Sequence, residues 1–351
     1  MAVKQARQAT IKDIARELGL SVATVSRALS RPELLKPETR ERVLAVAHRL
    51  GYQPNLIARG LRMQETRLIF VVTRSLSPFF LDVFRGVEVA AREFGYDVLM
   101  GHTEYIAERE GLFLDQVASG RADGVILVTS ADAVALATRR RPMPPLVAAL
   151  EAIDGLSVPT VCIDHTEAGA QAARHLIGLG HRRIAQIAGP GQMSMAKDRS
   201  EGFEREMRRA GLDPSAYPVL SGDFSIDFGE AAMRTLLAAT PPPTAVFAAN
   251  DEMAVGVLQA VKQARLEIGR DISVIGFNDQ RIASLYEPQL TTVHVPTAEL
   301  GYHSMRQMLR LLRGESTGEV IVLPTAVVER QTTGPAPAER PVRARGEKAP
   351  V

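Results

Sequence analysis

The chain has 351 residues, of which 46% are hydrophobic, and this length predicts two or three domains rather than one core. Cys162 is the one cysteine, and no apolar run approaches the roughly 18 residues of a bilayer-spanning helix, which excludes a disulfide framework and a membrane span. The formal net charge is +2, yet residues 1–67 carry 13 Lys or Arg against 6 Asp or Glu, so we expect a phosphate-binding surface there.

Two short helices are predicted directly after residues 1–9, which are polar and do not form a signal peptide. Thr10 and Asp13 form a helix-start pattern, and Gly19 is a residue type that ends helices. Ser21 is placed to cap a second helix one tight turn later. This spacing predicts a helix-turn-helix, and without an export signal we expect a cytoplasmic protein.

The second predicted helix has distinct inner and outer faces. Val25 and Leu29 face inward at helical spacing. The outward positions near its start can touch base edges in a major groove, and they are Val22, Ala23, Ser26 and Arg27.

A third helix is predicted from Pro37 to Gly51, covering the other two. After it, Asn55 is placed to cap a short helix that ends at Arg62. A short polar linker, residues 64–66, leads into the rest of the chain.

Strand and helix patterns alternate from residue 68 onward, which predicts an α/β body of two doubly wound parallel-sheet lobes. The expected strands are continuous apolar runs, as in sheets covered on both faces: 68–73, 97–101, 124–128, 146–150, 160–163, 184–187, 219–221, 245–248, 272–276, 290–295 and 320–323. The expected helices are 80–94, 107–118, a weaker one within 131–145, 168–179, 199–210, 228–239, 251–263 and 298–313. Residues 335–351 lack apolar periodicity, and we expect this tail to be disordered.

Four motifs in the first part of the chain resemble the headpiece of the LacI/GalR repressor family. They are T-I-K-D-I-A (10–15), S-V-A-T-V-S-R-A-L-S (21–30), T-R-E-R-V (39–43) and G-Y-Q-P-N-L-I-A-R-G-L (51–61). The resemblance continues to about residue 334. It implies a helix-turn-helix headpiece and a periplasmic-binding-protein-like body, and hence a ligand-responsive repressor.

The resemblance also implies DNA contacts. Val22 and Ala23 match the positions that vary with operator sequence, and Arg27 matches the arginine of the recognition helix. Leu61 matches a leucine that wedges into the minor groove and kinks it, beside Arg62. The full set of candidate DNA-binding residues is Thr10, Ser21, Val22, Ala23, Thr24, Ser26, Arg27, Asn55, Arg59, Leu61 and Arg62.

The family pattern implies a domain organisation. Residues 1–54 are the headpiece, 55–66 the hinge helix and linker, and 67–334 the effector-binding and dimerisation domain. Lobe one comprises about 67–164 and 296–323, and lobe two about 165–295 and 324–334. The tail has no leucine heptads, so a tetramerising coiled coil is not expected. The expected assembly is a homodimer bound to double-stranded operator DNA.

An effector site is expected where the strands of such sheets end. The candidate ligand-binding residues follow predicted strands or match the family's cleft positions, and they are Phe79, Phe80, Ser130, Asp164, Arg199, Phe224, Asn250 and Asn278. Arg199 is placed in a first helical turn, where the helix dipole disfavours a cation, so an external role is inferred. Asp251 is expected to cap the helix beside Asn250.

The ligand class follows from these residue types and from a closer resemblance to nucleoside-responsive members of the family. Asn278 stands where several members carry an aspartate, and Met193 and Met195 argue against a free purine base. We expect a nucleoside, with a pentose, hexose or sugar acid as the alternative. A transporter's solute-binding protein is an alternative of a different class. The G-P-G-Q-M-S segment has too few glycines for a dinucleotide fingerprint, and the sequence has no Walker A loop and no H-E-x-x-H motif. No enzyme, cofactor, catalytic residue or metal is therefore expected.

Overall fold

The computed structural model describes residues 9–30, 35–52, 65–128, 136, 143–315 and 318–338. The chain forms two compact units, residues 1–66 and 67–351. The predictions for Asn55, Arg59, Leu61, Arg62 and Ser130 lie outside the described residues, and so does the tail from residue 339.

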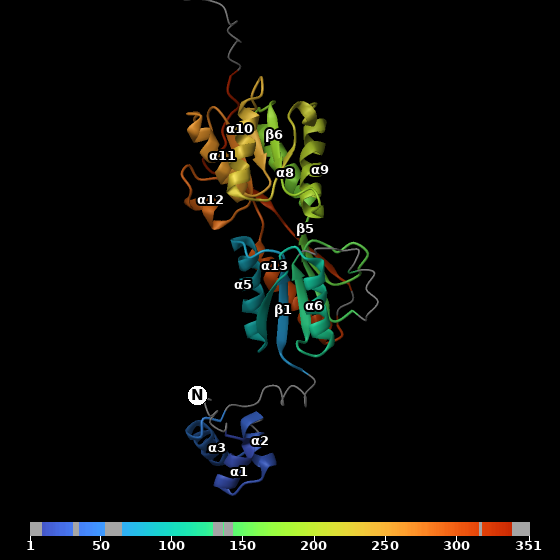
Figure 1. The fold of residues 1–351 in the computed structure, drawn as a ribbon, viewed down its shortest axis with the longest axis vertical. Coiled ribbons are helices and arrows are strands. Elements are labelled where there is room, and N and C mark those ends of the chain that lie inside the picture. Colours follow the sequence, from blue (N-terminus) through green and yellow to red (C-terminus); the bar gives the residue numbers. More distant parts are fainter. Residues whose placement is uncertain are drawn as a thin grey trace, which may run out of the picture. The chain divides into compact units, whose positions relative to one another are not determined.

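The described residues of the first unit form three packed helices, labelled in Figure 1: α1 (Ile11–Leu18), α2 (Val22–Ser30) and α3 (Pro37–Arg49). Its core includes Ile14, Val25 and Val43, each fully buried. Gly19 follows α1 with φ +66°, a left-handed conformation that glycine adopts without steric cost. Asp13 accepts hydrogen bonds from the backbone and the hydroxyl of Thr10, so the carboxylate ties down the helix start.

Lobe one of the second unit is a parallel sheet in the order β11-β5-β4-β3-β1-β2. Its strands are β1 (Leu68–Thr73), β2 (Asp97–His102), β3 (Gly124–Val128), β4 (Leu146–Leu150), β5 (Thr160–Ile163) and β11 (Val320–Leu323). The described helices that cover it are α5 (Pro78–Glu93), α6 (Ala107–Ala118) and α13 (Thr297–Leu312). Ile69 and Val71 pack in the core of α5 and α13, whereas Phe70 and Val72 pack towards α6. Burial on both faces explains why this strand is apolar throughout.

Lobe two repeats the design, with the order β12-β10-β9-β8-β6-β7. Its strands are β6 (Ile184–Ala188), β7 (Leu220–Ser221), β8 (Ala245–Ala248), β9 (Ser273–Asn278), β10 (Thr291–His294) and β12 (Ala326–Val328). Its helices are α8 (His165–Gly178), α9 (Ser194–Arg209), α10 (Ile226–Leu237), α11 (Asp251–Gln263), α12 (Arg281–Leu285) and the short 3-10 turn Pro214–Ala216. β12 was not expected, and it pairs antiparallel with β10, an exception to the predicted parallel pattern.

The chain passes between the lobes at three places. They lie between β5 and α8, between β10 and α13, and between β11 and β12. Parallel strands whose carboxyl ends face one another across such crossovers leave a cleft between the two sheets.

Helix α9 begins earlier than predicted. It starts at Ser194, so Arg199 lies in the second turn and not in the first. The helix-dipole argument for Arg199 was therefore wrong. The predicted cap of α11 was also wrong, because the side chain of Asn250, not Asp251, accepts the hydrogen bond from Met253 N–H at 2.9 Å.

Candidate functional site

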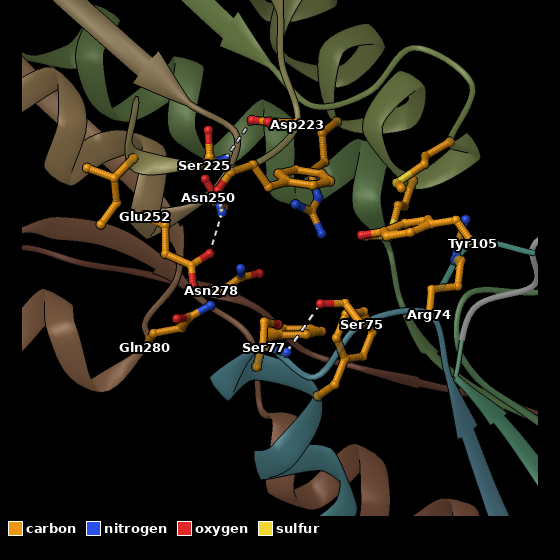
Figure 2. Close-up of a pocket in the computed structure, with 17 residues that line it drawn as sticks. Arg74, Ser75, Ser77, Tyr105, Asp223, Ser225, Asn250, Glu252, Asn278 and Gln280 are labelled. Atoms are coloured by element: carbon orange, nitrogen blue, oxygen red, sulfur yellow. Dashed lines mark hydrogen bonds between the residues drawn. The ribbon is translucent and has the colours of Figure 1, made fainter. Parts of the chain in front are cut away.

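A cavity of about 330 Å³ lies between the two lobes. Lobe one contributes segments that follow β1 and β2, and lobe two contributes segments that follow β6, β7, β8 and β9. Figure 2 shows these side chains converging from both sides. The lining residues are Arg74, Ser75, Ser77, Phe79, Phe80, Tyr105, Met193, Met195, Arg199, Asp223, Phe224, Ser225, Ile226, Asn250, Glu252, Asn278 and Gln280.

Arg199 is the most deeply buried charge in the cavity wall, with 1% of its surface exposed. Its Nη1 donates to the Ala249 carbonyl at 2.8 Å, and its Nε donates to His165 Nδ1 at 3.2 Å. Its Cζ lies 3.8 Å from the centre of the Phe277 ring, in a cation–π contact. Nη2 is buried and has no hydrogen-bond partner. Burial lowers the pKa of Arg199 to about 9, so the guanidinium remains charged at neutral pH.

Asn278 supplies the complementary group. Its Oδ1 is buried without a hydrogen-bond partner, and the residue has φ +107°, in the region that favours glycine. A buried polar atom left unpaired costs free energy unless something else satisfies it. Arg199 and Asn278 therefore carry an unpaired donor and an unpaired acceptor in the wall of the same cavity.

Asn250 is held in place by its own hydrogen bonds. Its Nδ2 donates to the Phe224 carbonyl at 2.9 Å and to Glu252 at 2.8 Å, while its Oδ1 caps α11. Burial raises the pKa of Glu252, although the hydrogen bond from Asn250 opposes that effect. Phe224 has φ +69° and also lines the cavity.

Aromatic rings form the apolar walls. Phe79 and Phe80 meet edge to face, with centroids 5.3 Å apart, and both line the cavity together with Phe224. These rings suit a planar ring or the apolar face of a sugar.

Five of the eight predicted ligand-binding residues line the cavity, namely Phe79, Phe80, Arg199, Phe224 and Asn278. Asn250 also lines it, but as a helix cap. Asp164 does not line it. Its exposed carboxylate accepts from Glu167 N–H at 2.8 Å as the cap of α8, so we do not retain it as a ligand contact.

Several lining residues were missed at the level of sequence. Ser75 and Ser77 directly follow β1, and Gln280 follows β9, so the rule that ligands bind beyond strand ends would have indicated them. Tyr105 lies in the loop after β2 with φ +63°, a conformation that no sequence pattern indicated.

One polar chain joins the two lobes beside the cavity. Arg74, after β1, pairs with Glu151, after β4, at 2.9 Å, and both side chains are about nine-tenths buried. The other carboxylate oxygen of Glu151 accepts from the hydroxyl of Ser194 at 2.7 Å, at the start of α9 in lobe two.

The first unit carries the second candidate surface. Ser21 Oγ accepts from Thr24 N–H at 3.1 Å and lies 2.8 Å from the Thr24 hydroxyl, which fixes the start of α2. Val22 and Ala23 are exposed there. Arg27 is exposed one turn later, and its Nε lies 3.4 Å from the Ala23 carbonyl.

Known proteins resemble both units. Residues 10–55 match the model of the bacterial regulatory proteins of the lacI family, and residues 173–333 match a periplasmic binding protein-like domain. The HTH-type transcriptional repressor CytR of Escherichia coli (strain K12) is 37% identical over 319 residues, which cover 90% of this chain and 94% of that protein. The chain belongs to the LacI family. The ribose operon repressor of the same strain is 38% identical over 84% of this chain and 90% of its own.

The solved structures agree with this assignment. A crystal structure of the Lac repressor dimer, bound to operator and the anti-inducer ONPF, matches with a TM-score of 0.84 and 29% identity, over 93% of this chain and all of that one. This LacI-family chain is therefore a DNA-binding transcriptional repressor with an effector-binding domain. It is a regulator and not an enzyme, as predicted. Among the described residues, no helix combines the length and apolar character that crossing a membrane requires.

Proposed function

We propose that this repressor binds a near-palindromic operator as a homodimer and that a nucleoside in the interlobe cavity controls its affinity for DNA. The observation that carries the ligand proposal is the pair of buried, unpartnered groups, Arg199 Nη2 and Asn278 Oδ1, in one cavity. A sugar hydroxyl can accept from the first and donate to the second. The rings of Phe79, Phe80 and Phe224 then offer faces and edges for a base.

Charge supports a neutral ligand. The positive groups of the cavity wall are Arg74, which pairs with Glu151, and Arg199, while Asp223 and Glu252 bring carboxylates to the same wall. A phosphorylated ligand would meet these carboxylates as well as the arginines, whereas an uncharged nucleoside would not. The resemblance of the sequence to nucleoside-responsive members of the family favours the same class, and the likeness to the ribose operon repressor makes free ribose the second candidate.

A thermal-shift panel tests the ligand class. Cytidine, uridine, adenosine, ribose and gluconate are each added to the purified chain, because a ligand that binds the folded state alone raises Tm with its concentration. A rise with the nucleosides supports the proposal. A rise with ribose alone replaces it by the second candidate, and a rise with gluconate alone indicates a sugar acid.

The proposed dimer uses the domain boundaries given by the family pattern: headpiece 1–54, hinge helix 55–66 and body 67–334. In this arrangement, the two copies place their α2 helices in successive major grooves, and Leu61 and Arg62 of each copy enter the minor groove between them. Ligand binding changes operator affinity to the extent that the ligand binds the two lobe arrangements unequally. Sedimentation velocity on the full chain tests the dimer, since a monomer at micromolar concentration contradicts it.

Arg27 is the side chain on which operator specificity is proposed to depend most. It is exposed on α2, whereas Val22 and Ala23 offer apolar contact to thymine methyl groups. We predict that Arg27→Ala weakens binding to the specific operator by about 1–3 kcal/mol while nonspecific binding changes little. Arg16→Ala is the matched control, because Arg16 is an exposed arginine of α1 and the variant loses the same charge. Equal losses in a gel-shift titration of both variants would assign Arg27 to phosphate attraction instead.

A further inference from the structure

His165 connects the cavity wall to the opposite lobe. It is the first residue of α8, immediately after the crossover from β5, and 5% of it is exposed. Its Nδ1 lies 3.2 Å from Arg199 Nε in lobe two. Its Nε2 lies 3.2 Å from the carbonyl oxygen of Leu150, the last residue of β4 in lobe one, which has φ +76°.

The partners of this ring determine its protonation. Arg199 Nε carries a hydrogen and can only donate, so Nδ1 must accept. The Leu150 carbonyl can only accept, so Nε2 must carry the proton. The imidazole is therefore neutral, with its hydrogen on Nε2.

The same contact restricts the guanidinium. Nη1 is bound to Ala249, Nε is bound to His165, and Cζ lies over the Phe277 ring, which leaves Nη2 as the nitrogen without a partner in an arginine that lines the cavity. We propose that His165 is a positioning residue, which holds Arg199 in its ligand-binding orientation and joins that orientation to the backbone of lobe one. This inference rests on the proposed function, since it assigns the ligand contact to Arg199.

Acid should release the arginine. Protonation would place a second N–H at Nδ1, facing the N–H of Arg199, so the hydrogen bond would be lost and two cations would meet. Burial and the charge of Arg199 hold the pKa of His165 well below its ordinary value, while the hydrogen bond to Leu150 opposes them. Glu151, Asp251 and Asp198 are the carboxylates that favour the charged form of Arg199. Asp164, on the same helix turn, is exposed and caps α8.

The ligand-free test observes the Arg199 Nε–H directly. In ¹⁵N-labelled full-length protein, that resonance, identified by its loss in Arg199→Lys, should exchange slowly with water. We expect His165→Ala to abolish the protection and His165→Gln, which retains one acceptor and one donor, to keep it. Because the pKa of His165 is lowered, the protection should fade in the wild type, but not in His165→Gln, only at a pH well below 6.5, the ordinary value for histidine. Protection that survives in a folded His165→Ala variant would overturn the inference, as would its absence from the wild type.

A second measurement uses cytidine as the probe. The Kd of His165→Ala should rise at least about tenfold, the effect of losing an orienting hydrogen bond to a charged group, and that of His165→Gln by less. If the wild type does not bind cytidine, the nucleoside proposal fails while the exchange experiment still decides the role of His165. If the wild type binds and His165→Ala binds equally well, the role of His165 fails and the proposed function stands.

Discussion

The buried guanidinium of Arg199 costs free energy that the fold must offset. Two of its five N–H groups donate hydrogen bonds and the ring of Phe277 contacts its Cζ, while Nη2 has no hydrogen-bond partner. In the same cavity wall, Asn278 keeps an acceptor unpaired on a backbone with φ +107°. Unpaired polar atoms and unfavourable backbone angles of this kind are typical of binding sites, where a bound ligand supplies the missing hydrogen bonds.

Asn278→Gly separates binding from stability. Glycine accepts φ +107° without steric cost, so the variant loses the ligand acceptor while its backbone strain is relieved. We predict that affinity for the nucleoside falls about tenfold, while Tm without ligand stays the same or rises. Isothermal titration and thermal unfolding measure the two effects. A drop in Tm with unchanged affinity would show that the side chain serves the fold.

Asp251 should give stability a measurable pH dependence. Its carboxylate is fully buried and accepts from Thr292 Oγ1 and Gln280 N–H, each at 2.6 Å. Burial raises its pKa to about 7, despite these hydrogen bonds. Because the pKa is raised in the folded state, protonated Asp251 stabilises the folded protein. This stabilisation is complete below pH 4 and is lost as pH rises through about 7.

The comparison that isolates Asp251 is with Asp251→Asn. The unfolding free energy of the wild type minus that of the variant should fall with pH by up to about 1.4 kcal/mol per unit from pH 5 towards 7, then level off. Urea unfolding at five pH values measures it. Burial lowers the pKa values of His165, His175 and His181, so these residues make the free energy of unfolding rise with pH. Subtracting the value of the variant from that of the wild type cancels this effect. A difference that is flat from pH 5 to 8 would mean that Asp251 titrates at its ordinary pKa.

At the scale of helices, pairs of glycines set the distance between neighbours. A Cβ on Gly202 of α9 would lie 1.8 Å from the Thr166 carbonyl oxygen of α8, and one on Gly169 would lie 2.1 Å from that of Arg199. Backbone therefore packs directly on backbone. This close approach brings the start of α8, with His165, within reach of the Arg199 side chain.

Gly202→Ala should disturb the site through this contact. The added methyl must push α9 away from α8, at a cost of about 1–3 kcal/mol, and it should weaken ligand binding by moving Arg199. Gly178→Ala is the control, because it lies at the end of α8 and an added Cβ meets nothing within 4 Å. Thermal unfolding and ligand titration of both variants check this. Equal behaviour of the two would show that the crossing tolerates a methyl group.

The sequence indicated elements better than it indicated contacts. The apolar runs predicted strands such as β1, β3, β4 and β5 with the observed bounds, because burial on both faces leaves a continuous signal. The start of α9 was not predicted, because the residue before it, Met193, is not a capping residue type. Its side chain makes no hydrogen bond to the first turn of the helix. The partners of Arg199 could not be predicted, because Ala249 and His165 reach it only after the lobe has folded.

At the scale of the whole effector-binding unit, the two lobes are linked by chain crossovers and by side chains. Glu151 joins Arg74 of lobe one to Ser194 of lobe two, and His165 joins Arg199 to Leu150. Both links border the cavity, so the ligand and these contacts act on the same separation of the lobes. Each of these contacts contributes a free energy close to the one that allosteric coupling requires. Together they determine the separation of the lobes.

Ser194→Ala removes one of these contacts between the lobes and changes little else. Glu151 keeps its ion pair with Arg74, so no buried charge is left unpaired, but the lobe-to-lobe hydrogen bond is lost. A hydrogen bond to a charged group contributes about 1.5–3 kcal/mol, so the population of the arrangement with this contact, and with it ligand affinity, should fall by up to about 10- to 150-fold. Ligand titration measures the affinity, and small-angle X-ray scattering of the free protein should show an increased radius of gyration.

Ser284→Ala, in the exposed surface of α12, is the control. Unchanged affinity and an unchanged radius in Ser194→Ala would show that the crossovers alone hold the lobes, and that the contact between Ser194 and Glu151 follows closure without stabilising it.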